Sequence, residues 1–214
     1  MDGNMPSVKH SFRTLSVPAL LTSLSVLMAF GSVTPAAASV SDDPAVEAAI
    51  LEVRESLPAG ELVKFDALSE ADQDLFVTSI TDLDAYDFVV VEDETSVMPD
   101  SPSARAATKT YSKVFTVNAE LFGITTGQYR QEIRYSVNGS TTKAPHFCSG
   151  TFTGWAGFWS ISNSNSSWVS GNKAYCSTNY TLSVLWQGNS AQMNKQMQQT
   201  GTSGGSISGY LKNI

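Results

Sequence analysis

The sequence predicts a mainly β protein, an antiparallel β-sandwich or small barrel preceded by a short acidic helical segment. Three observations predict it: apolar and polar residues alternate with period two beyond Thr108, helical periodicity is confined to the preceding residues, and charge divides along the chain. Residues 39–100 hold 17 acidic and 2 basic side chains, a net charge of −15, whereas residues 101–214 hold 2 acidic and 9 basic side chains, a net charge of +7. We therefore expect the acidic segment to dock on the basic domain of its own chain.

Residues 1–38 have the pattern of a secretory signal peptide. A positively charged region is followed by an apolar stretch over residues 15–30, and small residues before Ser39 suit cleavage there. The positively charged region consists of Lys9, His10 and Arg13. We expect the protein to be extracellular.

Two helices are expected in the acidic segment, residues 39–100. The first covers residues 42–57: acidic residues and Pro44 suit its start, and Pro58 ends it. The second begins at Ser69, where Ser69 and Asp72 have capping-box spacing. Apolar residues follow at helical spacing in both, namely Val46, Ile50, Val53 and Leu57, then Leu75, Phe76 and Ile80. A short strand is expected at residues 88–91.

Residues 101–107 resemble an exposed linker because they are small and polar and include Pro102. Such segments are where proteases cut, so one interpretation places processing at Arg105 and Ala106 and makes the acidic segment a propeptide. The other interpretation is an ordinary linker between two permanently joined parts.

Residues 108–214 are expected to form the basic β domain, with about seven short strands. Two alternating apolar sets indicate strands with one buried face, and Asn138-Gly139 indicates a hairpin with a type I′ turn. The alternating sets are Tyr129, Gln131, Ile133, Tyr135 and Val137, and Tyr180, Leu182, Val184 and Trp186. Cys148 and Cys176 are expected to pair in an oxidising compartment, which would stabilise the fold by about 3.5 kcal/mol.

The order of a signal peptide, an acidic helical leader and a β domain with the hexapeptide Tyr135–Ser140 and a late cysteine pair resembles uncharacterised small secreted β-domain proteins of actinobacteria. The resemblance implies a bacterial cell-exterior context and no activity.

The inventory of reactive side chains argues against an enzyme. The segments around His146 and Ser203 resemble the catalytic His and Ser motifs of chymotrypsin-like proteases. That family has an Asp before its Ser, where this chain has Thr202, and no carboxylate lies between His146 and Ser203 to orient the imidazole. Glu120 and Glu132 suit salt bridging better than a glycosidase pair. We predict no catalytic residue, no metal ligand and no cofactor.

A binding role is the predicted function. All four tryptophans lie in a stretch rich in Ser, Thr, Asn and Gly, and Trp155 and Trp159 flank a turn that favours exposure and stacking on sugar rings. Basic side chains would add attraction, and the candidates are Lys109, Lys113, Arg130, Arg134 and Lys143. We predict non-catalytic binding to a glycan or anionic polymer of a cell envelope, with the acidic segment masking the basic domain. The alternative is a pore-forming or antimicrobial toxin, acting at a membrane surface and activated by removal of residues 39–105. Nucleic acid is a poorer partner because the basic residues are sparse.

Overall fold

The computed structural model describes residues 43–91, 95–98, 108–155 and 158–214, which belong to one compact unit. Several predicted features lie outside the described residues, namely the signal peptide, cleavage before Ser39, and processing at Arg105 and Ala106. The predicted domain boundaries stay predictions.

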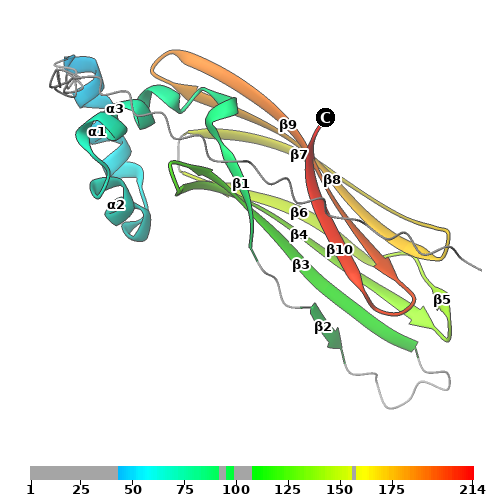
Figure 1. Cartoon of the computed structure of the whole chain (residues 1–214). Coiled ribbons are helices and arrows are strands. Elements are labelled where there is room, and N and C mark those ends of the chain that lie inside the picture. Colours follow the sequence, from blue (N-terminus) through cyan, green and yellow to red (C-terminus); the bar gives the residue numbers. More distant parts are fainter. Residues whose placement is uncertain (1–42, 92–94, 99–107, 156–157) are drawn as a thin grey trace, which may run out of the picture. The chain divides into compact units, whose positions relative to one another are not determined.

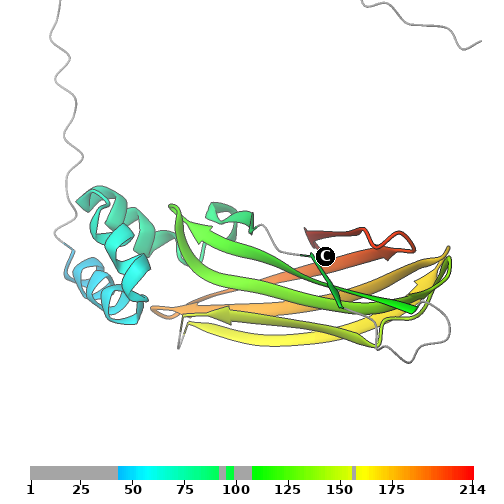
Figure 2. The ribbon, with the colours of Figure 1, turned by 90° about the horizontal axis from the view of Figure 1, so that it is seen from below.

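In the part of the chain that the structure describes, ten strands form two antiparallel sheets. Sheet A contains β1 (Asp87–Val91), β2 (Thr95–Met98), β3 (Thr108–Leu121), β4 (Ile124–Asn138), β5 (Thr141–Thr142) and β6 (Phe147–Gly154). Sheet B contains β7 (Trp159–Ser170), β8 (Lys173–Trp186), β9 (Asn189–Thr202) and β10 (Ile207–Asn213), in the spatial order β10-β9-β8-β7. The two sheets pack face to face as separate layers (Figure 2), which confirms the predicted sandwich and rules out a closed barrel. Several strands are much longer than expected.

Among the described residues, three helices precede the strands: α1 (Pro44–Ser56), α2 (Ala59–Asp66) and α3 (Glu70–Ser79), followed by the 3₁₀ turn η1 (Leu83–Ala85) (Figure 1). The predicted starts of α1 and α3 are confirmed, because the Asp43 side chain accepts from the Ala45 amide at 2.9 Å and Ser69 accepts from the Asp72 amide at 3.2 Å. The short helix α2, which begins directly after Pro58, was not predicted.

Three two-residue turns join the long strands, and both central residues of each have positive φ, as type I′ turns require. These turns are Phe122-Gly123, Gly171-Asn172 and Gln187-Gly188. The type I′ turn predicted at Asn138-Gly139 is wrong. Asn138 pairs with Thr141, so the turn residues are Gly139 and Ser140, and only Gly139 has positive φ (60°). Because only its first central residue is left-handed, this hairpin has the pattern of a type II′ turn.

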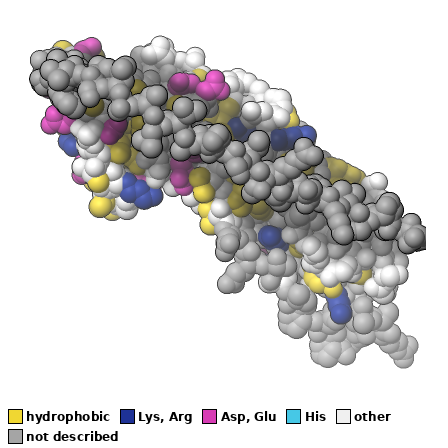
Figure 3. Space-filling model, viewed as in Figure 1, with side chains coloured by type: hydrophobic (Ala, Val, Ile, Leu, Met, Phe, Trp, Pro, Cys, Tyr) yellow, Lys and Arg dark blue, Asp and Glu magenta, His cyan; other side chains and the backbone are white. Residues whose placement is uncertain are grey.

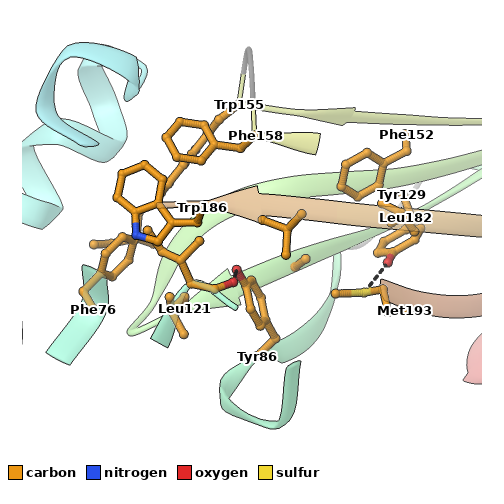
Figure 4. Close-up of a cluster of buried hydrophobic side chains, with 14 of the residues drawn as sticks. Phe76, Tyr86, Leu121, Tyr129, Phe152, Trp155, Phe158, Leu182, Trp186 and Met193 are labelled. Carbon is orange, nitrogen blue, oxygen red and sulfur yellow. Dashed lines mark hydrogen bonds between the residues drawn. The ribbon is translucent and has the colours of Figure 1, made fainter. Parts of the chain in front are cut away.

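The core lies between the two sheets and continues under the helices. The inward faces of β4 and β8 are buried as the alternation predicts, and Tyr129 and Tyr180 stack edge to face at 5.1 Å. At the helical end, aromatic rings from α3, β8 and the β6–β7 connection point toward one another (Figure 4), with Phe76 and Trp155 5.8 Å apart and Phe158 and Trp186 4.8 Å apart.

A polar layer, buried at Gln131 and Thr178 and reaching solvent at the β7 edge, ties the two sheets together. Gln131 Nε2 on β4 donates to Thr178 Oγ1 on β8 at 2.8 Å, and Thr178 donates to Asn165 Oδ1 on β7 at 2.7 Å. The same Asn165 oxygen accepts from the Gly150 amide of β6 at 3.0 Å, and Asn163 Nδ2 donates to the Gly150 carbonyl at 2.8 Å. Side chains of one sheet therefore satisfy the backbone of the other along the edge where β6 and β7 meet.

The predicted disulfide is confirmed. Cys148 on β6 and Cys176 on β8 are bonded, with Cα atoms 5.4 Å apart, so the bond crosses from sheet A to sheet B.

The acidic segment contributes strands as well as helices to the unit. β1 and β2 both pair with β3, the predicted strand at residues 88–91 being part of β1. Across the boundary, Glu61 accepts from the Thr125 amide at 2.9 Å, and Lys195 Nζ lies 3.5 Å from the centroid of the Phe88 ring. On the face shown in Figure 3, most of the acidic side chains lie over the helical end. Masking of the basic domain by these charges stays a prediction.

Candidate functional site

The structure corrects the exposure predicted for Trp155. This side chain is only 7 % exposed, its ring packs on Phe76 and Phe158, and its Nε1 donates to the Thr125 carbonyl at 3.2 Å. The ring of Trp155 lies against Phe76 of α3, a contact distant in sequence that no local pattern reveals. Trp155 borders a cleft of about 540 Å³ shared with Pro58 and Glu61, but its ring face is not available for stacking.

Trp159 is partly buried and packs against the core. Its ring meets Tyr86 and Phe152 edge to face, at 6.1 and 5.5 Å. It lies at an inward position of β7, opposite the buried Val184. Neither of the two predicted stacking residues therefore presents a free ring face to solvent.

The predicted basic residues do not come together in one place. Arg130 and Arg134 lie on the outer face of sheet A, where both pair with Glu132, at 3.5 and 2.6 Å. Arg134 also lies 4.8 Å from the centroid of the Phe147 ring. Lys113 is partly buried and donates to the Ile207 carbonyl at 3.4 Å, and the remaining two, Lys109 and Lys143, are exposed elsewhere.

The carboxylates of the β domain are not placed as a catalytic pair. Glu132 lies opposite Val114, six residues along β3 from Glu120, a separation of about 20 Å. Glycosidase carboxylates lie at most about 9.5 Å apart. His146 is exposed, and among the described residues no group of three or more His, Cys, Asp or Glu side chains could hold a metal ion.

The shifted pKa values belong to the core. Burial raises the pKa of Tyr86, Tyr129 and Tyr180, and raises that of Tyr135 to about 12. Burial also lowers the pKa of Lys195. The tyrosine hydroxyls are already bonded inside the protein; that of Tyr135, for example, donates to the Thr202 carbonyl at 2.8 Å. These shifts therefore reflect packing and not a poised acid and base.

The outer face of sheet B is a polar surface built by strand alternation. On β8 the even-numbered residues are buried, so the odd-numbered residues and their partners on neighbouring strands point outward. β7 contributes Ser160, Ser162, Ser164, Ser166, Trp168 and Ser170, and β8 contributes Lys173, Tyr175, Ser177, Asn179, Thr181 and Ser183. β9 contributes Gln192, Asn194, Gln196, Gln198 and Thr200, and β10 contributes Ser208, Tyr210 and Lys212.

Aromatic rings interrupt this polar surface at two places. Trp168 and Tyr175 lie directly opposite each other, and their rings stack 5.1 Å apart at an angle of 5°. Trp168 is 39 % exposed, and Tyr210 on β10 is 42 % exposed. Trp168 is thus the tryptophan that the structure leaves open to solvent, and the sequence-based prediction did not select it.

Sheet B has no acidic side chain, because the sequence contains no Asp or Glu after Glu132. Its outer face therefore offers hydroxyl and amide groups, exposed aromatic rings and the two lysines Lys173 and Lys212. Hydroxyls and amides both donate and accept hydrogen bonds, and aromatic rings present apolar faces. Together they suit a ligand that carries many hydroxyl groups and has apolar C–H faces.

Comparison of the chain with protein-family models, with curated proteins and with solved structures finds no match. In the described part of the chain, no helix has the length and apolar character needed to cross a membrane.

Proposed function

We propose that this chain is a secreted, non-catalytic binding protein that holds a glycan at a cell envelope through the outer face of sheet B. The observation that carries the proposal is the exposed Trp168–Tyr175 stack within a surface of Ser, Thr, Asn and Gln side chains. Sugar rings have apolar C–H faces that stack on aromatic rings, and their hydroxyls need partners of the kind that surround this stack.

The scaffold supports such a site because it is rigid where the ligand would bind. The outward side chains stand on four long paired strands, and their positions are fixed by backbone pairing. A binding surface on strands is held more precisely than one on loops. The cross-sheet disulfide suits a protein that works in an oxidising extracellular compartment.

A pull-down with insoluble cell-wall polysaccharide tests this proposal. Trp168→Ala removes the exposed half of the stack, and we expect it to weaken binding by about 10-fold. A nucleobase stacked on an aromatic side chain contributes about 1–3 kcal/mol, and we take a stacked sugar ring to contribute a similar amount. The melting temperature should change little because the ring is exposed.

Phe147→Ala is the matched control. Phe147 is an aromatic residue of the same exposure, 39 %, but it lies on β6 of the other sheet. Its removal should leave glycan binding unchanged. Equal loss of binding in both variants, or none in either, would contradict a site on the outer face of sheet B.

A further inference from the structure

Two tyrosines on the outer face of sheet B, Tyr175 and Tyr210, each have a lysine two residues away on the same strand. Lys173 precedes Tyr175 on β8, and Lys212 follows Tyr210 on β10. Residues two apart on a strand share a face, so each lysine projects beside its ring. The Lys212 Nζ atom lies 5.8 Å from the centroid of the Tyr210 ring.

The strand register places these four residues on one diagonal line across the sheet. Tyr210 lies opposite Gln198, and Gln198 lies opposite Ser177, which is two residues beyond Tyr175. The line from Tyr175 to Tyr210 therefore crosses from β8 over β9 to β10 and also advances two residues along the strand direction. At about 4.8 Å between strands and about 3.4 Å per residue, the two Cα atoms are roughly 12 Å apart. The lysines extend the line at both ends, to a total of roughly 22 Å. The order along it is Lys173, Tyr175 with Trp168, Tyr210 and Lys212.

The two lysines are available to a ligand. Both are exposed, and neither forms an ion pair with a described residue. By contrast, Arg130 and Arg134 on sheet A are already paired with Glu132. Sheet B has no Asp or Glu, so no acidic side chain of that sheet offsets the positive charge at the two ends of the line.

From this arrangement we infer that the ligand is an extended acidic polysaccharide that lies along the diagonal line. Its sugar rings stack on Trp168–Tyr175 and on Tyr210, and its carboxylate groups pair with Lys173 and Lys212. Gln198, which lies between the two aromatic positions and is partly exposed, faces the hydroxyls of the intervening sugar. The inference rests on the proposed glycan-binding function and adds the charge and the extended form of the ligand.

Matched polymers separate the charge of the ligand from its sugar rings. We would measure binding of the full chain to immobilised polygalacturonate and to its methyl ester, and to carboxymethyl cellulose and hydroxyethyl cellulose. In each pair the backbone is shared and only the first member is anionic. We expect at least 10-fold tighter binding to the anionic members, and we expect this preference to shrink at 1 M salt, where the Debye length is about 3 Å. Poly(glycerol phosphate), which is anionic but has no sugar ring, should bind weakly.

Charge-removing variants locate the preference on the protein. Lys173→Gln and Lys212→Gln should each weaken binding to the anionic polymers by about fivefold and leave binding to the neutral polymers unchanged. Lys64→Gln is the control, because it removes the same charge from an exposed residue of α2, whose Nζ lies beside the Gly123 carbonyl of the β3–β4 turn in sheet A.

The outcomes distinguish the two levels of the proposal. Equal binding to the neutral and anionic members, lowered by Trp168→Ala, would overturn the acidic ligand and leave glycan binding standing. Binding to none of the four polysaccharides would contradict both. A preference for the anionic members that Lys64→Gln lowers as much as Lys173→Gln would overturn the diagonal line.

Discussion

Trp186 Nε1 on β8 donates a 2.9 Å hydrogen bond to the carbonyl oxygen of Val77 in α3, 109 residues earlier in the chain. Both residues are buried in the cluster that includes Leu121 and Phe158. The bond therefore joins the acidic helices and the basic sandwich inside one apolar core. The helical segment is therefore part of the fold.

Trp186→Phe should destabilise the protein by about 1–3 kcal/mol, because it leaves the buried Val77 carbonyl without its partner while keeping an aromatic ring in place. Urea denaturation followed by circular dichroism measures the change. Trp168→Phe is the control: that ring is exposed, so its replacement should change stability by less than about 0.5 kcal/mol.

A chain reduced to residues 108–214 should be markedly less stable than the chain from Ser39. Its β3 edge would lose both β1 and β2, and the apolar surface under the helices would be open to water. Thermal unfolding and binding of a hydrophobic dye would show this. A fragment that melts as the longer chain does would instead favour a removable propeptide.

Gly150→Ala should destabilise the sandwich by about 2 kcal/mol or more, because a Cβ there would lie 2.3 Å from Thr178 Oγ1 and 2.5 Å from the Tyr180 hydroxyl. Thr178 Oγ1 donates to Asn165 Oδ1 and the Tyr180 hydroxyl donates to the Arg130 carbonyl, so neither atom can move without breaking a hydrogen bond. The midpoint of chemical denaturation measures the loss.

Gly60→Ala is the matched control for that variant. A Cβ at Gly60 would meet nothing within 4 Å, and the residue lies in α2. We expect a gain in stability of about 0.5–1 kcal/mol. A loss at Gly60 similar to that at Gly150 would show that close packing is not the cause.

Stability should fall above pH 10. The pKa values of Tyr86, Tyr129, Tyr135 and Tyr180 are raised above the ordinary 10.0, so the unfolded chain loses protons before the folded one. Their contribution is complete below pH 10 and is lost as pH rises further. Lys195 has the opposite effect: because its pKa is lowered, the free energy of unfolding rises as pH rises toward 10.5. Four tyrosines oppose this single lysine, so we expect a net loss of stability.

Urea midpoints measured from pH 9 to pH 11 test this, and Tyr129→Phe should reduce the fall. Tyr129 is suited to the test because its ring is fully buried and its hydroxyl donates only to the Met193 sulfur, at 3.2 Å. An unchanged slope in that variant would assign the alkaline loss to other groups.

The fold class could be predicted because strands and helix starts depend mainly on residues that are close together in the sequence. Alternation from Tyr129 to Val137 marks a strand with one buried face, and the spacing of Ser69 and Asp72 marks a helix start. Helix α2 was missed because eight residues that follow Pro58 give too short a pattern to recognise.

The site could be predicted only in part, because exposure depends on contacts distant in sequence. The stretch rich in tryptophan, serine and asparagine was recognised, but Trp155 and Trp159 are covered by α3 and by Tyr86, which no local pattern reveals. A signal for Trp168 was nevertheless present. Trp168 is an even-numbered position and shares its side of the strand with Ser160, Ser162, Ser164 and Ser166, whereas Trp159 lies on the other side. The side of a strand that carries mostly polar residues faces solvent, so this pattern indicates that Trp168 is exposed.

The most direct test of a glycan site on sheet B is a map of backbone amide chemical shifts in the full chain, recorded with and without a soluble cell-wall glycan fragment. We expect the largest changes on β7, β8 and β10 around Trp168, Tyr175 and Tyr210. Changes centred on Arg130 and Arg134 of sheet A, or on the cleft beside Pro58 and Trp155, would contradict it.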